Sequence, residues 1–313
     1  MSSLRRFALW VMGFDVVTVL WGALVRATGS GAGCGAHWPL CNGVVFPRSP
    51  TAETLVEMTH RLTGGVALVL VFALVIWSLR VLPRGHAGRM AALTAGAFIV
   101  LEALVGAALV LFGWVGNDNS AARGGAVVVH LVNTFLLLGS LALTAALVDG
   151  PGRLTVRGRG PLAAAMGLAL ATVVVSGATG AVAALGDTLY PAASVASGLA
   201  EDLREQAPFL LRLRLVHPFT SLASALVLVV IARAVLQARE QRLRSPALRL
   251  LVLLGLQLLA GALNVVLLAP IWLQIVHLGL ADVTWIALVM LAAASLSSRP
   301  EAVPSAVRTA FEV

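Results

Sequence analysis

The sequence predicts an all-α integral membrane protein with eight transmembrane helices, arranged as two pseudo-twofold-related four-helix bundles. Hydrophobic residues make up 59% of the 313 residues and charged residues only 12%, a composition that soluble globular domains do not have. Several apolar stretches reach the roughly 20 residues that a helix needs to cross a bilayer. The net charge of +8 comes from arginines that lie between these stretches, so it indicates membrane topology and gives no support to nucleic-acid binding.

The apolar stretches define the spans in chain order. Because cytoplasmic loops carry an excess of basic residues, the side on which arginines gather is predicted to be cytoplasmic. Both termini then lie in the cytoplasm of a multi-pass cell-membrane protein, and the long connections 27–53 and 186–208 lie outside the cytoplasm. The predicted spans are 7–26, 55–81, 90–112, 124–148, 161–185, 209–236, 248–268 and 271–297. The arginines that set this orientation are Arg5, Arg6, Arg80, Arg84, Arg89, Arg153, Arg157, Arg159, Arg239, Arg242, Arg244, Arg249, Arg299 and Arg308.

The chain also shows an internal duplication. Residues 101–109 (LEALVGAAL) resemble residues 256–264 (LQLLAGALN) at an offset of 155 residues (256 − 101). A span histidine recurs at a similar offset of 157 (217 − 60). Two halves of the same orientation imply a pseudo-twofold axis along the membrane normal. We therefore expect an amino-terminal half, 1–150, and a carboxy-terminal half, 151–313, of four helices each.

Four of the six histidines fall within predicted spans. They occupy the second, fourth, sixth and eighth spans, about 10 Å below the outer surface at a rise of 1.5 Å per residue. Two histidines that face each other in a four-helix bundle can bind a haem iron from both sides. A hydrogen-bonding core residue is the alternative for any single intramembrane histidine, but the shared depth of all four favours haem ligation. These residues are His60, His130, His217 and His277.

Glu57 precedes His60 by three residues, so the two side chains share one face of a helix. An ionisable residue at membrane depth usually marks a functional site. The alternative is an interfacial acid that pairs with Arg61 or Arg123. The carboxy-terminal half has Arg214 in place of a carboxylate three residues before His217, which favours ligand binding alone in that half and proton-coupled chemistry in the other.

Cys34 and Cys41 are the only cysteines, and both lie in the first outer connection. Their spacing, with Gly and Pro between them, can close a small disulfide loop in an oxidising location. Two interpretations stay open: a structural disulfide, or a redox-active pair that handles electrons near a haem.

These features together resemble the haem A synthase family, the CtaA type related to the mitochondrial Cox15 proteins. The resemblance covers essentially the whole chain, and includes one histidine in each of four alternate spans. The chain departs from the family at Gly35-Ala36-His37, where many relatives have Pro and Asp before the Trp. The matching segments are Thr28-Gly29-Ser30-Gly31, Cys34 with Trp38-Pro39-Leu40-Cys41-Asn42-Gly43, and Glu57-x-x-His60-Arg61.

The resemblance implies successive hydroxylation of a ring methyl of haem O to the formyl group of haem A, for cytochrome oxidase biogenesis. It implies that the substrate haem lies near His60 and His130, that haem b is a cofactor held between His217 and His277, and that Glu57 is catalytic. The expected partners are the lipid bilayer, a farnesyltransferase that supplies haem O, and an electron donor.

Other polar residues are assigned from their positions. Arginine binds carboxylates through two parallel hydrogen bonds, so arginines near the outer ends of spans are expected to pair with haem propionates, the alternative being ordinary interfacial arginines. Glu102 and Gln257 occupy equivalent places in the two repeats and are interpreted as structural interhelical hydrogen-bonders. The propionate-pairing candidates are Arg61, Arg123, Arg212 and Arg214.

Two other functions fit parts of the pattern. A bis-histidine dihaem electron-transfer protein, of the ferric or quinol reductase type, would also need four histidines. Such proteins place haems at both membrane faces, whereas these histidines share one depth. A transporter with intramembrane histidines is the second alternative.

Overall fold

The computed structural model describes residues 1–150, 154 and 159–297. Within these residues, eight helical segments are long and apolar enough to span a membrane, which confirms the predicted all-α membrane fold. Four arginines used for the orientation, Arg153, Arg157, Arg299 and Arg308, lie outside the described residues, as does residue 151, where the second half was predicted to begin. The helices are α1 (Ser3–Ala27), η1 (Ser30–Ala32), α2 (Ala52–Val81), α3 (Ala87–Leu111), α4 (Ala121–Leu147), α5 (Gly160–Leu189), α6 (Val195–Asp202), α7 (Phe209–Arg214), α8 (Val216–Gln237), α9 (Gln241–Val266) and α10 (Ile271–Leu296).

Local sequence fixes where several helices begin. The side chains of Ser2, Thr51 and Ser120 each accept a hydrogen bond from the backbone N–H three residues later, at the starts of α1, α2 and α4. Such caps satisfy backbone donors that have no partner within the helix. The cap at Thr51 fixes the first turn of the helix that carries Glu57 and His60.

The sixth predicted span is interrupted near its amino-terminal end. Helix α7 ends at Arg214 and α8 begins at Val216, and the two together make one candidate span. Pro218 explains the break, because its ring has no N–H and clashes with the carbonyl four residues earlier, that of Arg214. In the first turn of α8 the missing N–H costs nothing. His217 therefore lies at a helix start rather than within a continuous helix.

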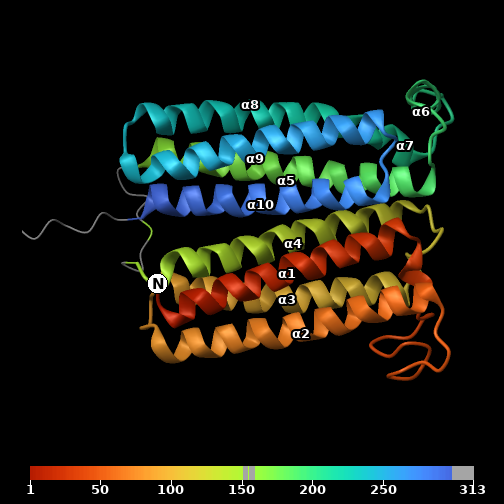
Figure 1. Cartoon of the computed structure of the whole chain (residues 1–313), viewed down its shortest axis with the longest axis horizontal. Helices are drawn as coiled ribbons and strands as arrows, with labels where there is room; N and C mark the ends of the chain where they lie inside the picture. Colours follow the sequence, from red (N-terminus) through yellow and green to blue (C-terminus); the bar gives the residue numbers. More distant parts are fainter. Residues whose placement is uncertain (151–153, 155–158, 298–313) are drawn as a thin grey trace, which may run out of the picture.

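The helices form two groups of four that lie side by side (Figure 1). Helices α1 to α4 pack around one apolar core, and α5, α8, α9 and α10 pack around another. The groups meet where α1 and α4 contact α5 and α10. There Trp285 stacks on Phe135 with ring centroids 5.1 Å apart and donates a hydrogen bond to its carbonyl oxygen. The pseudo-twofold relation between the groups stays a prediction.

Each group arranges its helices in a ring. Helices α2 and α4 both contact α1 and α3, and α8 and α10 both contact α5 and α9. Helix α2 therefore lies diagonally opposite α4, and α8 lies diagonally opposite α10. These four helices carry the four span histidines, so the fold places one histidine on each of two opposite helices in both groups.

Candidate functional site

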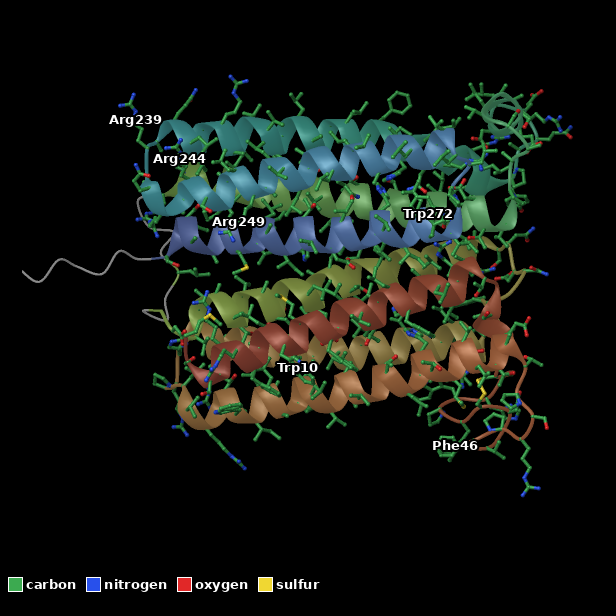
Figure 2. The ribbon with its side chains drawn as sticks, viewed as in Figure 1. Trp10, Phe46, Arg239, Arg244, Arg249 and Trp272 are labelled. Atoms are coloured by element: carbon green, nitrogen blue, oxygen red, sulfur yellow. A yellow bond between two sulfur atoms is a disulfide. The ribbon has the colours of Figure 1, made fainter. Side chains whose placement is uncertain are left out.

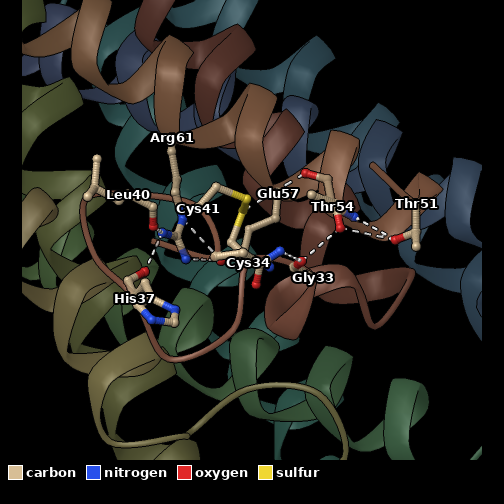
Figure 3. Close-up of a disulfide and its surroundings, with 10 residues drawn as sticks. Gly33, Cys34, His37, Leu40, Cys41, Thr51, Thr54, Glu57 and Arg61 are labelled. Atoms are coloured by element: carbon tan, nitrogen blue, oxygen red, sulfur yellow. Dashed lines mark hydrogen bonds and ion pairs between the residues drawn. A yellow bond between two sulfur atoms is a disulfide. The ribbon is translucent and has the colours of Figure 1, made fainter. Parts of the chain in front are cut away.

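The connection after α1 is a loop closed by the disulfide between Cys34 and Cys41, which confirms the predicted pairing (Figure 3). Both cysteines are buried. The backbone N–H of Cys34 donates to Oε2 of Glu57 at 2.8 Å. The guanidinium of Arg61, one turn further along α2, donates to the other carboxylate oxygen, Oε1. Glu57, only 3% exposed, thus joins the disulfide loop to α2.

Further contacts clamp this loop on the start of α2 (Figure 3). Arg61 Nη1 donates to the carbonyl oxygens of His37 and Leu40, at 2.5 Å and 2.6 Å. Thr54 Oγ1 donates to the carbonyl oxygen of Gly33 at 2.8 Å. A Cβ at Gly33 would lie 2.5 Å from the carbonyl carbon of Glu53, so only glycine allows this approach. The loop is therefore fixed to the first turns of α2, by residues on both sides of His60 in the sequence.

In the amino-terminal group, His60 and His130 have different surroundings. The His60 ring packs against Gly22 of α1, where an added Cβ would lie 2.8 Å from Cε1 of the ring. Its Nδ1 is buried and has no hydrogen-bond partner among the described residues. Nδ1 of His130 lies 3.2 Å from Oε1 of Glu102 on α3. This contact is within ion-pair distance but does not have hydrogen-bond geometry, and it lies on the Nδ1 side of the ring.

In the carboxy-terminal group, the rings of His217 and His277 face each other. Their centroids are 6.4 Å apart and their planes are nearly perpendicular, at 80°. His217 Nδ1 lies 3.1 Å from the carbonyl oxygen of Ser176. Nε2 of His277 lies 3.4 Å from Nε2 of Gln257. The predicted pair of this half is thus brought together by the fold.

Glycines on neighbouring helices face three of the four imidazoles. Besides Gly22 at His60, a Cβ at Gly180 would lie 2.9 Å from Cε1 of His217, and one at Gly261 would lie 3.1 Å from Cε1 of His277. Any side chain at these positions would push the ring away. The three glycines therefore leave the space in which these three imidazole rings lie.

Comparison with known proteins decides the family. The COX15-CtaA family, described as cytochrome oxidase assembly protein, matches residues 5–289. The chain belongs to the COX15-CtaA family. Two Thermus thermophilus proteins named protoheme IX farnesyltransferase are 47% identical to it over 296 residues, which cover 94% of this chain and 49% of each relative. A heme A synthase of Halalkalibacterium halodurans is 40% identical over 111 residues, 36% of this chain and 37% of that protein.

Another heme A synthase, from Bacillus licheniformis, is 47% identical over 92 residues, 29% of this chain and 30% of that protein. The chain spans about half the length of the Thermus relatives, and its matches to the synthases cover about a third of each. Membership of the COX15-CtaA family therefore rests on the match across residues 5–289.

The four arginines predicted to pair with propionates all have protein partners in this COX15-CtaA chain. Arg123 donates to the carbonyl oxygens of Gly116 and Asp118, both at 2.6 Å. Arg212 donates to the carbonyl oxygen of Glu205, and Arg61 binds Glu57 and the disulfide loop, as described above. Arg214 bridges Asp187 at 2.9 Å and Asp202 at 2.5 Å. Two carboxylates already occupy Arg214, so a propionate would have to compete with them.

Two residues gain contacts that the sequence did not reveal. Glu102, interpreted as structural, contacts His130 directly. Arg26 was assigned no role, yet it joins the two helical groups of this COX15-CtaA protein. Its guanidinium on α1 donates to the carbonyl oxygen of Ala184 and to Thr188 Oγ1 on α5, both at 2.6 Å, and to Gln274 Oε1 on α10 at 2.9 Å. The sequence did contain one signal for the contact of Glu102. The repeat offset pairs Glu102 with Gln257, and each of them contacts a span histidine.

Proposed function

We propose that this chain is a haem A synthase, a membrane oxidoreductase that converts a ring methyl of haem O to the formyl group of haem A for cytochrome oxidase assembly. The observation that carries the proposal is the histidine pattern: one partly buried imidazole on each of two opposite helices in both groups, in a member of the COX15-CtaA family. The curated heme A synthases that match parts of the chain support the same reaction.

The carboxy-terminal pair fits a haem iron. Neutral imidazoles are good iron ligands, and two histidines that face each other within a four-helix group would hold a haem iron between them. The centroids of His217 and His277 are 6.4 Å apart. His217 directs its Nδ1 to the Ser176 carbonyl, which orients its Nε2 for a metal. Haem b would be held here, and it would supply one-electron transfer to the other half.

The glycine opposite His217 gives a test of this fit. Gly180→Ala introduces a Cβ 2.9 Å from the ring, and overpacking of this kind costs about 1–3 kcal/mol. We expect haem b retention to fall by about 10- to 100-fold, measured by the haem-to-protein ratio after purification. Gly167→Ala is the matched control, because it lies on the same helix and an added Cβ there meets nothing within 4 Å. Equal haem contents in the two variants would contradict the fit.

In the amino-terminal half, His60 and His130 would hold the substrate haem, and Glu57 would transfer protons during the reaction. Two hydroxylations convert the methyl to a gem-diol, each consuming dioxygen, two electrons and two protons and releasing one water, and the gem-diol then loses water to give the formyl group. Glu57 lies one turn before His60 and is nearly excluded from solvent. Its carboxylate is positioned by Cys34 and Arg61. A buried carboxyl so placed can take up and return protons at its Oε atoms.

The disulfide is proposed to be a structural element of this site. Its loop is also held by Thr54 and Arg61, so Cys34→Ser should still fold. A loop of this length is worth about 2–3 kcal/mol in the chain-entropy model of disulfides, and a lower thermal midpoint with unchanged haem content is expected. Cys41→Ser should behave identically. Retained stability with failed reduction of the bound haem would instead assign a redox function to the pair.

The orientation in the membrane is also part of the proposal. The labelled arginines Arg239, Arg244 and Arg249 lie towards the end of the bundle opposite Phe46 of the disulfide loop (Figure 2). The positive-inside rule puts the arginine-rich end in the cytoplasm, so both termini would be cytoplasmic and the disulfide loop extracytoplasmic.

Among the proposed partners, the one that supplies haem O can be named by its reaction. Two Thermus proteins named protoheme IX farnesyltransferase contain a segment similar to this chain within about half of their length. A single polypeptide with both parts would deliver its product directly to the second site. We propose that haem O reaches this chain from such a farnesyltransferase, and that a separate electron donor reduces haem b.

The alternative, a dihaem electron-transfer protein, is not favoured. It accounts for the histidines but not for the COX15-CtaA match or for a buried glutamate one turn before one ligand. Co-expression with a haem O-producing farnesyltransferase separates the two functions. We expect haem A in extracts of membranes that contain this chain, detected by liquid chromatography, and none with the His60→Ala variant. Haem O alone with the wild-type chain present would refute the synthase.

A further inference from the structure

Glu102 is embedded in a network centred on His130. Besides its 3.2 Å contact with His130 Nδ1, Oε1 accepts a hydrogen bond from Thr134 Oγ1 at 2.6 Å. Oε2 accepts one from Asn133 Nδ2, which also donates to the carbonyl oxygen of Phe98 at 2.9 Å. Three groups of α4 therefore hold the carboxylate of α3. These contacts hold the carboxylate next to the His130 imidazole.

The other half has neutral groups in the corresponding places. The amide nitrogen of Gln257, at the offset of 155 residues from Glu102 (257 − 102), lies 3.4 Å from Nε2 of His277. It can donate to that nitrogen, whereas Glu102 faces Nδ1 of His130. The partner of His217 Nδ1 is the backbone carbonyl of Ser176. The two halves thus differ in charge at one position: a carboxylate beside a histidine in the first, and an amide in the second.

This difference acts on whatever metal the histidine binds. A carboxylate that accepts the second N–H of a ligand histidine orients the ring and raises its basicity. A more basic ligand donates more electron density to iron and stabilises the oxidised state. Electron-rich iron favours cleavage of the O–O bond, as thiolate ligation does in P450s. A neutral backbone carbonyl, such as that of Ser176 at Nδ1 of His217, has a weaker effect, which suits a haem that only relays electrons.

We propose that Glu102 is a positioning residue for the reaction: it orients His130 and lowers the reduction potential of the haem iron bound there. Gln257, at the equivalent position of the repeat, is neutral and faces Nε2 of His277. The inference rests on the proposed function, because it assumes that haem binds in both halves. It adds that one carboxylate makes the two haem sites differ in reduction potential, one for oxidation of the substrate and one for electron transfer.

Potentiometric titration of the full-length, haem-loaded protein tests this assignment. The redox transition that disappears in His277→Ala is assigned to haem b. The transition that remains then belongs to the haem in the amino-terminal half. Glu102→Gln should move that remaining midpoint to higher potential and leave haem b unchanged. Asp15→Asn is the control, because it removes another buried carboxyl, on α1, that forms no hydrogen bond or ion pair with a histidine among the described residues. The inference is overturned if Glu102→Gln moves neither midpoint, or if Asp15→Asn moves it equally.

The reciprocal variant covers the case in which Glu102→Gln loses its haem. Gln257→Glu adds a negative charge beside Nε2 of His277, and this charge should move the haem b midpoint to lower potential. An unchanged haem b midpoint in that variant contradicts the proposed effect of the carboxylate. Failure of the wild-type protein to bind any haem would instead refute the proposed function. The two failures are therefore distinguishable.

Discussion

Replacement of His217 or His277 by alanine is expected to remove haem b while leaving the fold intact. The two rings face each other at a centroid distance of 6.4 Å, so each supplies one side of the proposed iron site. Loss of an outer-shell partner alone typically weakens metal binding 10- to 100-fold, and loss of a ligand should exceed about 100-fold. The reduced-minus-oxidised absorption spectrum should lose the haem b bands in either variant.

His86→Ala is the matched control. His86 caps the start of α3, outside the span histidines, and its Nδ1 accepts the backbone N–H of Gly88. This substitution removes an imidazole and a helix cap but no proposed ligand, so the haem b spectrum should remain. A normal spectrum in His217→Ala or His277→Ala would refute the assignment of this pair.

Glu57→Gln is expected to abolish haem A formation while haem b is retained. The variant keeps the size of the side chain and an oxygen that can accept the Cys34 N–H, but it cannot take up and release a proton. General acid–base groups typically contribute about 10²- to 10⁴-fold to a rate, and a loss in that range is expected. The measurement is the haem A to haem O ratio in membranes with a haem O supply.

Two comparisons separate chemistry from structure at Glu57. Glu53→Gln, one turn earlier on α2 and exposed, should leave haem A formation unchanged. Arg61→Ala removes the ion pair with Glu57 and two contacts to the loop but keeps the carboxylate. Full activity of Glu57→Gln would exclude Glu57 from the mechanism. Complete inactivity of Arg61→Ala with an unfolded loop would favour a structural function for the pair.

Much of the architecture was predictable because the bilayer imposes simple rules on sequence. Apolar stretches of sufficient length gave the eight spans, and the two cysteines in one connection gave the disulfide. The break at Leu215 was not predicted, although Pro218 in the sequence contains its cause. Hydropathy averages over a window and does not register a single missing N–H.

The site was less predictable, because contacts between helices depend on their rotation and depth. Spacing placed Glu57 beside Arg61 and His60, since these residues share one helix. It could not show that Glu57 also accepts the N–H of Cys34, 23 residues away. Glu102 and His130 lie on different helices, and the sequence alone does not fix which face of α3 meets α4. Asp187 and Asp202, which hold Arg214, likewise come from separate helices.

The central claim is that paired histidines in each half bind a haem, and extraction of haem from the purified full-length protein tests it most directly. Protein purified from membranes that contain a haem O-producing farnesyltransferase should yield haem b together with haem O or haem A. Haem b alone would contradict a substrate site at His60 and His130. A chain that carries no haem at all would contradict both sites.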